Sequence, residues 1–128
     1  MPTFTKKERL CNKKTISELY TSNKKLLVYP LSVHWLVLPN GQQPCPLQVV
    51  IVAPKKKLHN AVDRNRTKRL IRECYRTRKQ QIADILQQRG MQLALSINYI
   101  HTTPPDFKHL QHTFDKLFES LTNELSND

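Results

Sequence analysis

The chain has 128 residues, of which 38% are hydrophobic and 24% are charged, a composition typical of one globular domain with one core. Lysine and arginine number 21 and aspartate and glutamate number 10, which gives a formal net charge of +11. The two glycines of the whole chain exclude the glycine-rich phosphate cradles of Rossmann and P-loop proteins, and no apolar run approaches the ~18 residues of a transmembrane helix.

The first half of the chain predicts one short helix followed by three strands. Apolar side chains at spacing i, i+3, i+4 mark the helix, and Asn12 can cap its start. These apolar residues are Ile16, Leu19 and Tyr20. Strands are predicted over residues 26–29, 31–38 and 47–53, with a turn at 39–41 between the last two. The run LQVVIVA at 47–53 is rich in β-branched residues, which is typical of a buried central strand.

The second half predicts a long helix, a strand and a final helix. The long helix begins at about Ala61, Gly90 is a candidate C-cap at its end or after a break in the helix, and a strand follows over 91–99. Before the final helix, the segment TPPD at 103–106 supplies a capping threonine, a proline for the first helical position and an acid for the first turn. The apolar side chains of this helix share one face, which the core would bury. They are Phe107, Leu110, Phe114, Leu117, Phe118, Leu121 and Leu125. The predicted element order is therefore αβββαβα.

The charges are segregated along the chain. Residues 26–54 contain no Asp, Glu, Lys or Arg, whereas residues 55–79 hold 11 of the 21 basic residues and two acids. The first 25 residues add seven basic residues, and from residue 80 onward there are six acids and three bases. Evenly solvated faces usually mix both signs, so this pattern favours a surface that binds a polyanion over charges that merely oppose aggregation.

The long helix carries its positive charge on one side. At about 100° per residue, four neighbouring apolar residues form a stripe that the core would bury. They are Leu70, Ile71, Cys74 and Tyr75. The opposite arc is basic and polar, with Arg66 beside it and Arg64 and Arg78 at the edges of the stripe. The members of this arc are Asn65, Lys68, Arg69, Arg72, Arg76 and Lys79. Like charges at i, i+4 repel one another, and phosphates would neutralise them, so the arc predicts nucleic-acid binding.

The stretch NAVDRNRTKRLIRE at 60–73 resembles the "RNR" signature of the bacterial ribonuclease P protein component. The strand before it, the Lys56-Lys57 pair and the lead-in Asn60-Ala61-Val62 also match the spacing of that family, and the resemblance covers roughly residues 4–121. The family fold is an α/β (α+β) two-layer sandwich of the ribosomal protein S5 domain 2-like type. Its βαβ crossover is left-handed, against the usual rule, and carries the basic helix. The resemblance therefore implies a single RNA-binding domain over residues 1–128.

The family also implies a function. Its small protein joins a large catalytic RNA, and together they remove the 5′ leader from precursor tRNA by metal-dependent hydrolysis of one phosphodiester. The RNA carries the active site, so this chain is expected to act as an accessory subunit without catalytic residues of its own. The expected partners are the catalytic RNA and precursor tRNA, with no membrane. Mg²⁺ is expected to be bound mainly by the RNA subunit and the substrate, and none by the protein alone.

The resemblance places two RNA-binding surfaces on this chain. Guanidinium groups suit the first, because they bind phosphate oxygens bidentately. Its residues are Lys56, Lys57, Asn60, Arg64, Asn65, Arg66, Lys68, Arg69, Arg72 and Arg76. The second is a cleft between the first helix and the sheet, where the family binds the single-stranded leader. The matching positions are Ile16, Tyr20 and Leu38, and Tyr20 alone is aromatic. Fewer stacking platforms imply that leader contacts are weaker or depend more on backbone charge. His59 also stands where the family often has glycine.

Rival interpretations are less favoured by the residues. Asp63 and Glu73 are about 15 Å apart on a helix, too far to share one metal site. A zinc site would have to use His101 with two histidines at i, i+3, His109 and His112, and no cysteine accompanies them. A ribosomal-type or other structural RNA-binding protein, without a role in tRNA processing, is the alternative that the basic helix leaves open.

The cysteines and the N-terminus bear on location. Cys11, Cys45 and Cys74 lie far apart, are odd in number and form no C-x-x-C, which favours reduced thiols. Cys74 lies in the apolar stripe and is expected to be a small core residue. Residues 1–14 are polar and lack the apolar segment of a signal peptide. A cytoplasmic protein is therefore expected.

Overall fold

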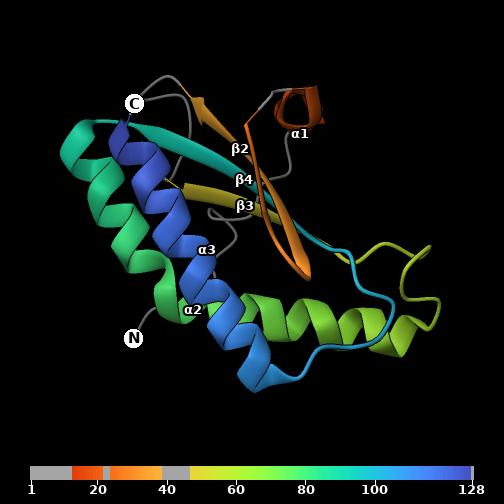
Figure 1. The fold of residues 1–128 in the computed structure, drawn as a ribbon. Helices are drawn as coiled ribbons and strands as arrows, with labels where there is room; N and C mark the ends of the chain where they lie inside the picture. Colours follow the sequence, from red (N-terminus) through yellow and green to blue (C-terminus); the bar gives the residue numbers. More distant parts are fainter. Residues whose placement is uncertain (1–12, 22–23, 39–46, 128) are drawn as a thin grey trace.

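The structure is a computed structural model that describes residues 13–21, 24–38 and 47–127 (Figure 1). The described elements follow the predicted order αβββαβα. They are α1 (Lys13–Thr21), β1 (Lys25–Val28), β2 (Leu31–Leu38), β3 (Leu47–Val52), α2 (Ala61–Arg89), β4 (Gln92–Tyr99) and α3 (Phe107–Asn127). The predicted strands 26–29, 47–53 and 91–99 therefore differ from the strands of the structure by one residue at one or both ends. The predicted cap Asn12, the turn at 39–41 and two cysteines, Cys11 and Cys45, lie outside the described residues.

The four strands form one mixed sheet in the order β1-β2-β4-β3. The β1/β2 and β2/β4 pairs are antiparallel, whereas β3 and β4 are parallel and are joined by the crossover through α2. The prediction of a central strand at 47–53 was wrong, because β3 lies at an edge of the described sheet. Its apolar run has another cause: Leu47 and Val49 pack in the main core, while Val50 packs on the opposite face. An edge strand covered on both faces has the same apolar sequence as a central one.

The helices cover the two faces of the sheet unequally. Figure 1 shows α2 and α3 together on one face and the short α1 on the other. The α2/α3 face holds the main core, which contains the buried Trp35. In this core the ring of Phe118 lies edge-on to Tyr75, with centroids 6.3 Å apart, and to Phe114, with centroids 5.7 Å apart. The smaller α1 face is built on Leu19 and Ala94. The predicted α+β sandwich is therefore confirmed, with α1 on its outer side.

The apolar face of α3 is buried as predicted except at Phe107, which is half-buried, and the start of this helix differs from the prediction. The helix begins at Phe107, and the Asp106 side chain accepts a hydrogen bond from the backbone N–H of His109 at 3.2 Å. Asp106 is thus the capping residue, and the predicted threonine cap was wrong. The carbonyl of Thr103 instead accepts a hydrogen bond from the Tyr99 hydroxyl at 2.6 Å. The two prolines that follow disfavour helix in the residues before them, so the helix begins after both.

Both predicted ends of α2 are confirmed. The Asn60 side chain accepts a hydrogen bond from the N–H of Val62 at 2.9 Å, and Gly90 closes the helix in the left-handed conformation, with φ 63°. Figure 1 shows that α2 bends near its middle, so that its second half runs beside α3 and its first half leads away. At the middle, the Thr77 hydroxyl donates to the Cys74 carbonyl at 3.1 Å. Such side-chain donors compete with the helical backbone bonds and favour bending.

Candidate nucleic-acid interface

The basic arc of α2 faces away from the core, as the helical spacing predicts. Three members of the predicted apolar stripe are buried, while Leu70 is half-buried. The buried ones are Ile71, Cys74 and Tyr75. Thr67 is buried as well, and its hydroxyl donates to the Asp63 carbonyl at 2.7 Å, so it enters the apolar face with its polar group satisfied. Asn65, Arg66, Arg69 and Arg72 are exposed, and Lys68, Arg76 and Lys79 are half-buried.

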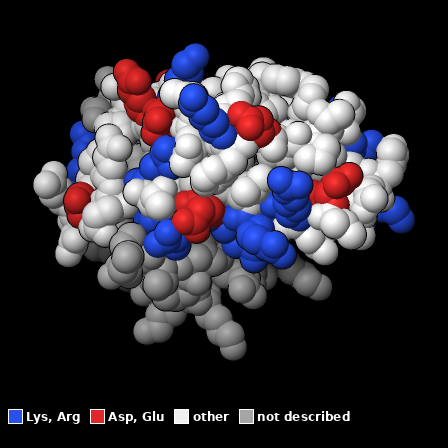
Figure 2. All heavy atoms as spheres, turned by 90° about the horizontal axis from the view of Figure 1, so that it is seen from below, with Lys and Arg blue, Asp and Glu red and all other residues white. Residues whose placement is uncertain are grey.

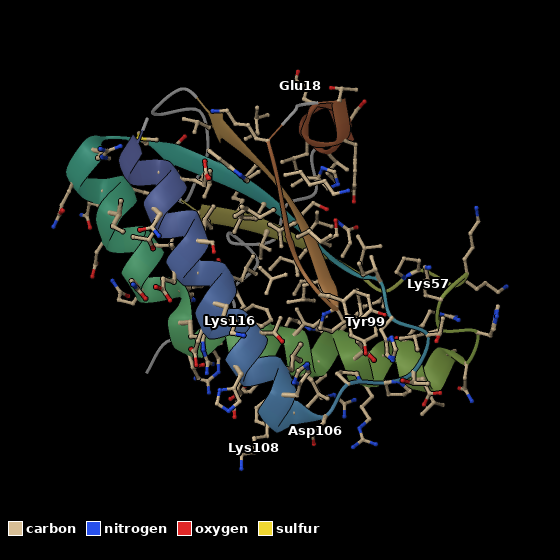
Figure 3. The ribbon with its side chains drawn as sticks, viewed as in Figure 1. Glu18, Lys57, Tyr99, Asp106, Lys108 and Lys116 are labelled. Carbon is tan, nitrogen blue, oxygen red and sulfur yellow. The ribbon has the colours of Figure 1, made fainter. Side chains whose placement is uncertain are left out.

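Two of the predicted RNA-binding residues shape the loop before α2. Arg64 Nη1 donates to the carbonyls of Leu58 at 2.9 Å and His59 at 2.8 Å, and Asn60 caps the helix. Leu58 is itself buried in the core, so these bonds hold the loop against the body of the protein. The neighbouring lysines Lys55, Lys56 and Lys57 form an exposed turn. Figure 3 shows Lys57 on this loop at the margin of the molecule. Arg64 and Asn60 therefore have a structural role, because they hold the loop that carries the lysine turn.

Two arginines of α2 are held by carboxylates of the protein itself. Arg76 pairs with Glu73 through two contacts, Nε to Oε2 at 3.1 Å and Nη2 to Oε1 at 2.5 Å. This hydrogen bond lowers the pKa of Glu73 below its usual value. Arg78 Nε lies 2.7 Å from Asp115 Oδ1 and so links α2 to α3. The sequence placed Arg76 among the RNA-binding residues, and the structure adds that a phosphate would compete there with Glu73.

Other cations of the predicted set make no ion pair with any residue that the structure describes. We call these six the basic surface: Lys56, Lys57, Arg66, Lys68, Arg69 and Arg72. Figure 2, seen from below Figure 1, shows Lys and Arg side chains gathered around the middle of that face with Asp and Glu side chains among them. Since both signs are present, the pairing of each cation decides what it offers to an anion. The basic surface can bind phosphate without first giving up a described carboxylate.

On the other face of the sheet, Tyr20 stands over a row of polar side chains that the sequence reasoning missed. Tyr20 as a residue is 45% exposed, and its hydroxyl lies 2.7 Å from Ser96 Oγ and 3.0 Å from Asn98 Oδ1. The centroid of the Tyr20 ring is 4.9 Å from that of His34. We call Tyr20, His34, Ser96 and Asn98 the α1-side strip. Strand alternation would have found it: Val33 and Trp35 face the main core, so His34 between them faces α1, and Ser96 is its cross-strand partner.

The other two positions of the predicted leader cleft contribute differently. Ile16 is half-buried and packs with Leu19 and Ala94, so it builds the apolar support of α1. Leu38 ends β2, and its side chain lies outside the described residues. His34 Nδ1 is buried without a hydrogen-bond partner in the described structure. Burial, together with the charge of Lys25, lowers the pKa of His34. The strip therefore presents a neutral imidazole and one exposed tyrosine ring.

The described residues offer neither a metal cluster nor a reactive thiol. No group of three or more His, Cys, Asp or Glu within 13–21, 24–38 and 47–127 is arranged to hold a metal ion. His101, which the alternative of a zinc site would need as a ligand, has its Nδ1 2.6 Å from the Tyr29 hydroxyl, at hydrogen-bond distance. Cys74 is a free thiol, and burial raises its pKa to about 11, which keeps it protonated at neutral pH. Among the described helices, none combines the length and apolarity that crossing a membrane requires.

Comparison with known proteins identifies the family. The sequence model of the Ribonuclease P family matches residues 4–122. The ribonuclease P protein component of Porphyromonas gingivalis is 34% identical over 117 residues, which cover 90% of this chain and 85% of that protein. The corresponding protein of Chlorobium phaeobacteroides is 33% identical over 82 residues, 59% of this chain and 56% of its own length. The solved structure of the Staphylococcus aureus RNase P protein has the same fold, with a TM-score of 0.65 at 16% identity over 89% of this chain and 94% of that chain. The chain therefore belongs to the ribonuclease P protein component family, the accessory subunit of the enzyme that processes the 5′ end of tRNA.

Proposed function

We propose that this protein binds the catalytic RNA of ribonuclease P through the basic surface and the 5′ leader of precursor tRNA along the α1-side strip. In this way it assists the endonucleolytic removal of the leader that gives the mature 5′ end. The basic surface carries the proposal, because six cations without a described carboxylate partner lie on one helix and the loop before it. Family membership supports tRNA processing over the alternative of a ribosomal-type RNA-binding protein.

The chemistry is proposed to belong to the RNA. The described carboxylates and histidines form no group that fits a divalent cation, so no hydrolytic step is assigned to this chain. Mg²⁺ is proposed to be held mainly by the RNA subunit and the substrate. The role of the protein is electrostatic. Its Lys and Arg side chains take the place of the counterions that the catalytic RNA and precursor tRNA, both polyanions, need when they approach each other. Lower Mg²⁺ concentrations should then suffice for substrate binding and cleavage.

The leader is assigned to the α1-side strip because of what Tyr20 offers. An exposed aromatic ring stacks on unpaired bases, at about 1–3 kcal/mol per base, and cannot stack on bases already inside a helix. Mature tRNA differs from the precursor only by the leader. A preference of the holoenzyme for precursor over mature tRNA would therefore come from this strip and not from the basic surface.

We further propose one domain over residues 1–128 and a cytoplasmic location. The single sheet and the core that joins α2, α3 and the strands support one domain. The free thiol of Cys74 fits a reducing compartment.

Reconstitution with the cognate catalytic RNA tests the proposal. The complex should cleave precursor tRNA at low Mg²⁺. The protein alone should not cleave it, whatever the Mg²⁺ concentration. Tyr20→Ala should weaken binding of precursor tRNA and leave binding of mature tRNA nearly unchanged. The matched control is Tyr29→Ala, since Tyr29 is another exposed tyrosine, 59% exposed, in the β1–β2 turn. Equal losses for the two tRNAs on Tyr20→Ala would remove the leader assignment, and cleavage by RNA-free protein would remove the whole proposal.

A further inference from the structure

The amide of Asn98 has its orientation set by the strand beside it. Its Nδ2 lies 3.1 Å from the carbonyl oxygen of Ser32, which can only accept a hydrogen bond. The NH₂ side of the amide must therefore face β2, and Oδ1 must face the other way. Oδ1 then accepts the hydrogen bond from the Tyr20 hydroxyl at 3.0 Å. The two ends of this amide thus join the sheet to the tyrosine of α1.

The bonds around Tyr20 close into a cycle with one consistent direction. The Tyr20 hydroxyl has one hydrogen, which it donates to Asn98, so at 2.7 Å from Ser96 it accepts the Oγ–H. Ser96 Oγ in turn accepts from Asn98 Nδ2 at 3.1 Å. Each of the three groups therefore donates to one neighbour and accepts from the other. Such closed chains polarise one another and hold their members more firmly than separate bonds do.

The cycle leaves Asn98 little capacity to bind anything else. Its carbonyl oxygen accepts from Tyr20, and its two amide hydrogens serve the Ser32 carbonyl and Ser96 Oγ. Ser96 is fully buried. Neither residue is therefore suited to read a base directly. Tyr20, by contrast, is 45% exposed as a residue, and its ring lies against the ring of His34. The hydrogen bonds therefore fix the hydroxyl end of a side chain on an exposed residue.

We propose that Ser96 and Asn98 are positioning residues for leader binding: they hold the Tyr20 ring in the orientation that stacks on an unpaired nucleotide. This inference rests on the proposed function, because it needs the leader to lie along the α1-side strip. The fixed ring has a physical advantage here. A side chain that is already immobile loses less conformational entropy on binding, which is worth about 2- to 10-fold in affinity for one side chain. This would offset in part the small number of aromatic residues, since Tyr20 is the one aromatic residue among the three predicted cleft positions.

A double-mutant cycle in the reconstituted holoenzyme tests the inference. Tyr20→Phe keeps the ring and removes the hydroxyl, and Asn98→Ala removes the partner. Each should weaken binding of precursor tRNA about 2- to 10-fold and leave mature tRNA binding and the single-turnover cleavage rate at saturation unchanged. The double variant should lose no more than the larger single loss, because both changes break the same cycle. Tyr29→Phe is the control, since it removes a hydroxyl that bonds to His101 at 2.6 Å, outside the strip.

The outcomes separate this inference from the proposed function. If Tyr20→Ala abolishes the preference for precursor while Tyr20→Phe retains it in full, the leader assignment stands and the positioning role is overturned. If Tyr20→Ala leaves precursor binding intact, both fall. Additive losses in the double variant would show that Asn98 acts independently of the hydroxyl and would overturn the cycle. Tyr20→Phe removes one atom at a partly exposed site, so it decides the question even where Asn98→Ala fails to fold.

Discussion

The salt dependence of RNA binding offers the most direct test of the basic surface. Each cation that neutralises a phosphate releases bound counterions. In a plot of log affinity against log salt concentration, each such contact contributes about 0.7–0.9 to the negative slope, and the basic surface has six cations. The affinity of the protein for the catalytic RNA should therefore fall with a slope on the order of −4 to −5. Removing Arg69 should make the slope shallower by about 0.7–0.9 and weaken binding by ~1–3 kcal/mol. The triple change Arg66/Lys68/Arg69→Ala should make it shallower by about 2–3.

The assay is a titration of RNA with protein across a potassium chloride series at constant Mg²⁺. Two controls remove a positive charge elsewhere. Arg78→Gln removes an arginine of the same helix that pairs with Asp115, and Lys116→Ala removes an exposed lysine of α3 (Figure 3). Both should leave the slope near that of the wild type. The reasoning fails if the triple variant has the wild-type slope, because the RNA would then be bound by another face of the protein.

Three further predictions concern stability. Asp106→Ala should lower the free energy of unfolding in urea by about 0.5–2 kcal/mol, because the helix cap is lost. Thr103→Ala keeps the backbone carbonyl that Tyr99 uses and should cost little. A larger loss for Thr103→Ala than for Asp106→Ala would show that Thr103 is the cap after all. Phe118→Ala should cost about 3–5 kcal/mol, since it opens a cavity between rings of α2 and α3, and a loss below that of a surface substitution would contradict the packing. The pKa of His34 is lowered in the folded state, so the unfolded chain takes up the proton first and stability should fall as pH drops through 6.5. His34→Gln should reduce that fall, and the same change at the exposed His112 is the comparison.

Local sequence patterns were sufficient where neighbours along the chain decide the structure. The apolar spacing of α3 and the buried stripe of α2 are confirmed, because a helix brings residues three and four apart onto one face whatever surrounds it. The ends of α2 were predictable for the same reason. Asn60 and Gly90 act on backbone groups within a few residues of themselves.

Contacts between distant segments could not be predicted in this way. The apolar run of β3 indicates burial on two faces but does not say whether a further strand lies beyond it, since the order of strands depends on pairings across the whole chain. Tyr20 and its partner Ser96 are 76 residues apart. Their contact depends on where α1 crosses the sheet. The prediction of the α3 cap failed for a more local reason. Thr103 and Asp106 are both residue types that cap helices well, and the hydrogen bond between Tyr99 and Thr103 helps decide between them.

A helical wheel treats all cations of α2 alike, and the structure divides them by partner. Arg76 and Arg69 lie on the same arc, but Arg76 is held by Glu73 and Arg69 has no described carboxylate partner. A phosphate that binds Arg76 must displace Glu73 and then tolerate its negative charge nearby, so the net gain is smaller than at Arg69. Arg76→Ala should therefore weaken RNA binding less than Arg69→Ala. Glu73→Gln should strengthen binding in the wild type and change little once Arg76 is replaced. If Glu73→Gln weakens RNA binding instead, the carboxylate orients Arg76 toward the RNA and does not compete with it.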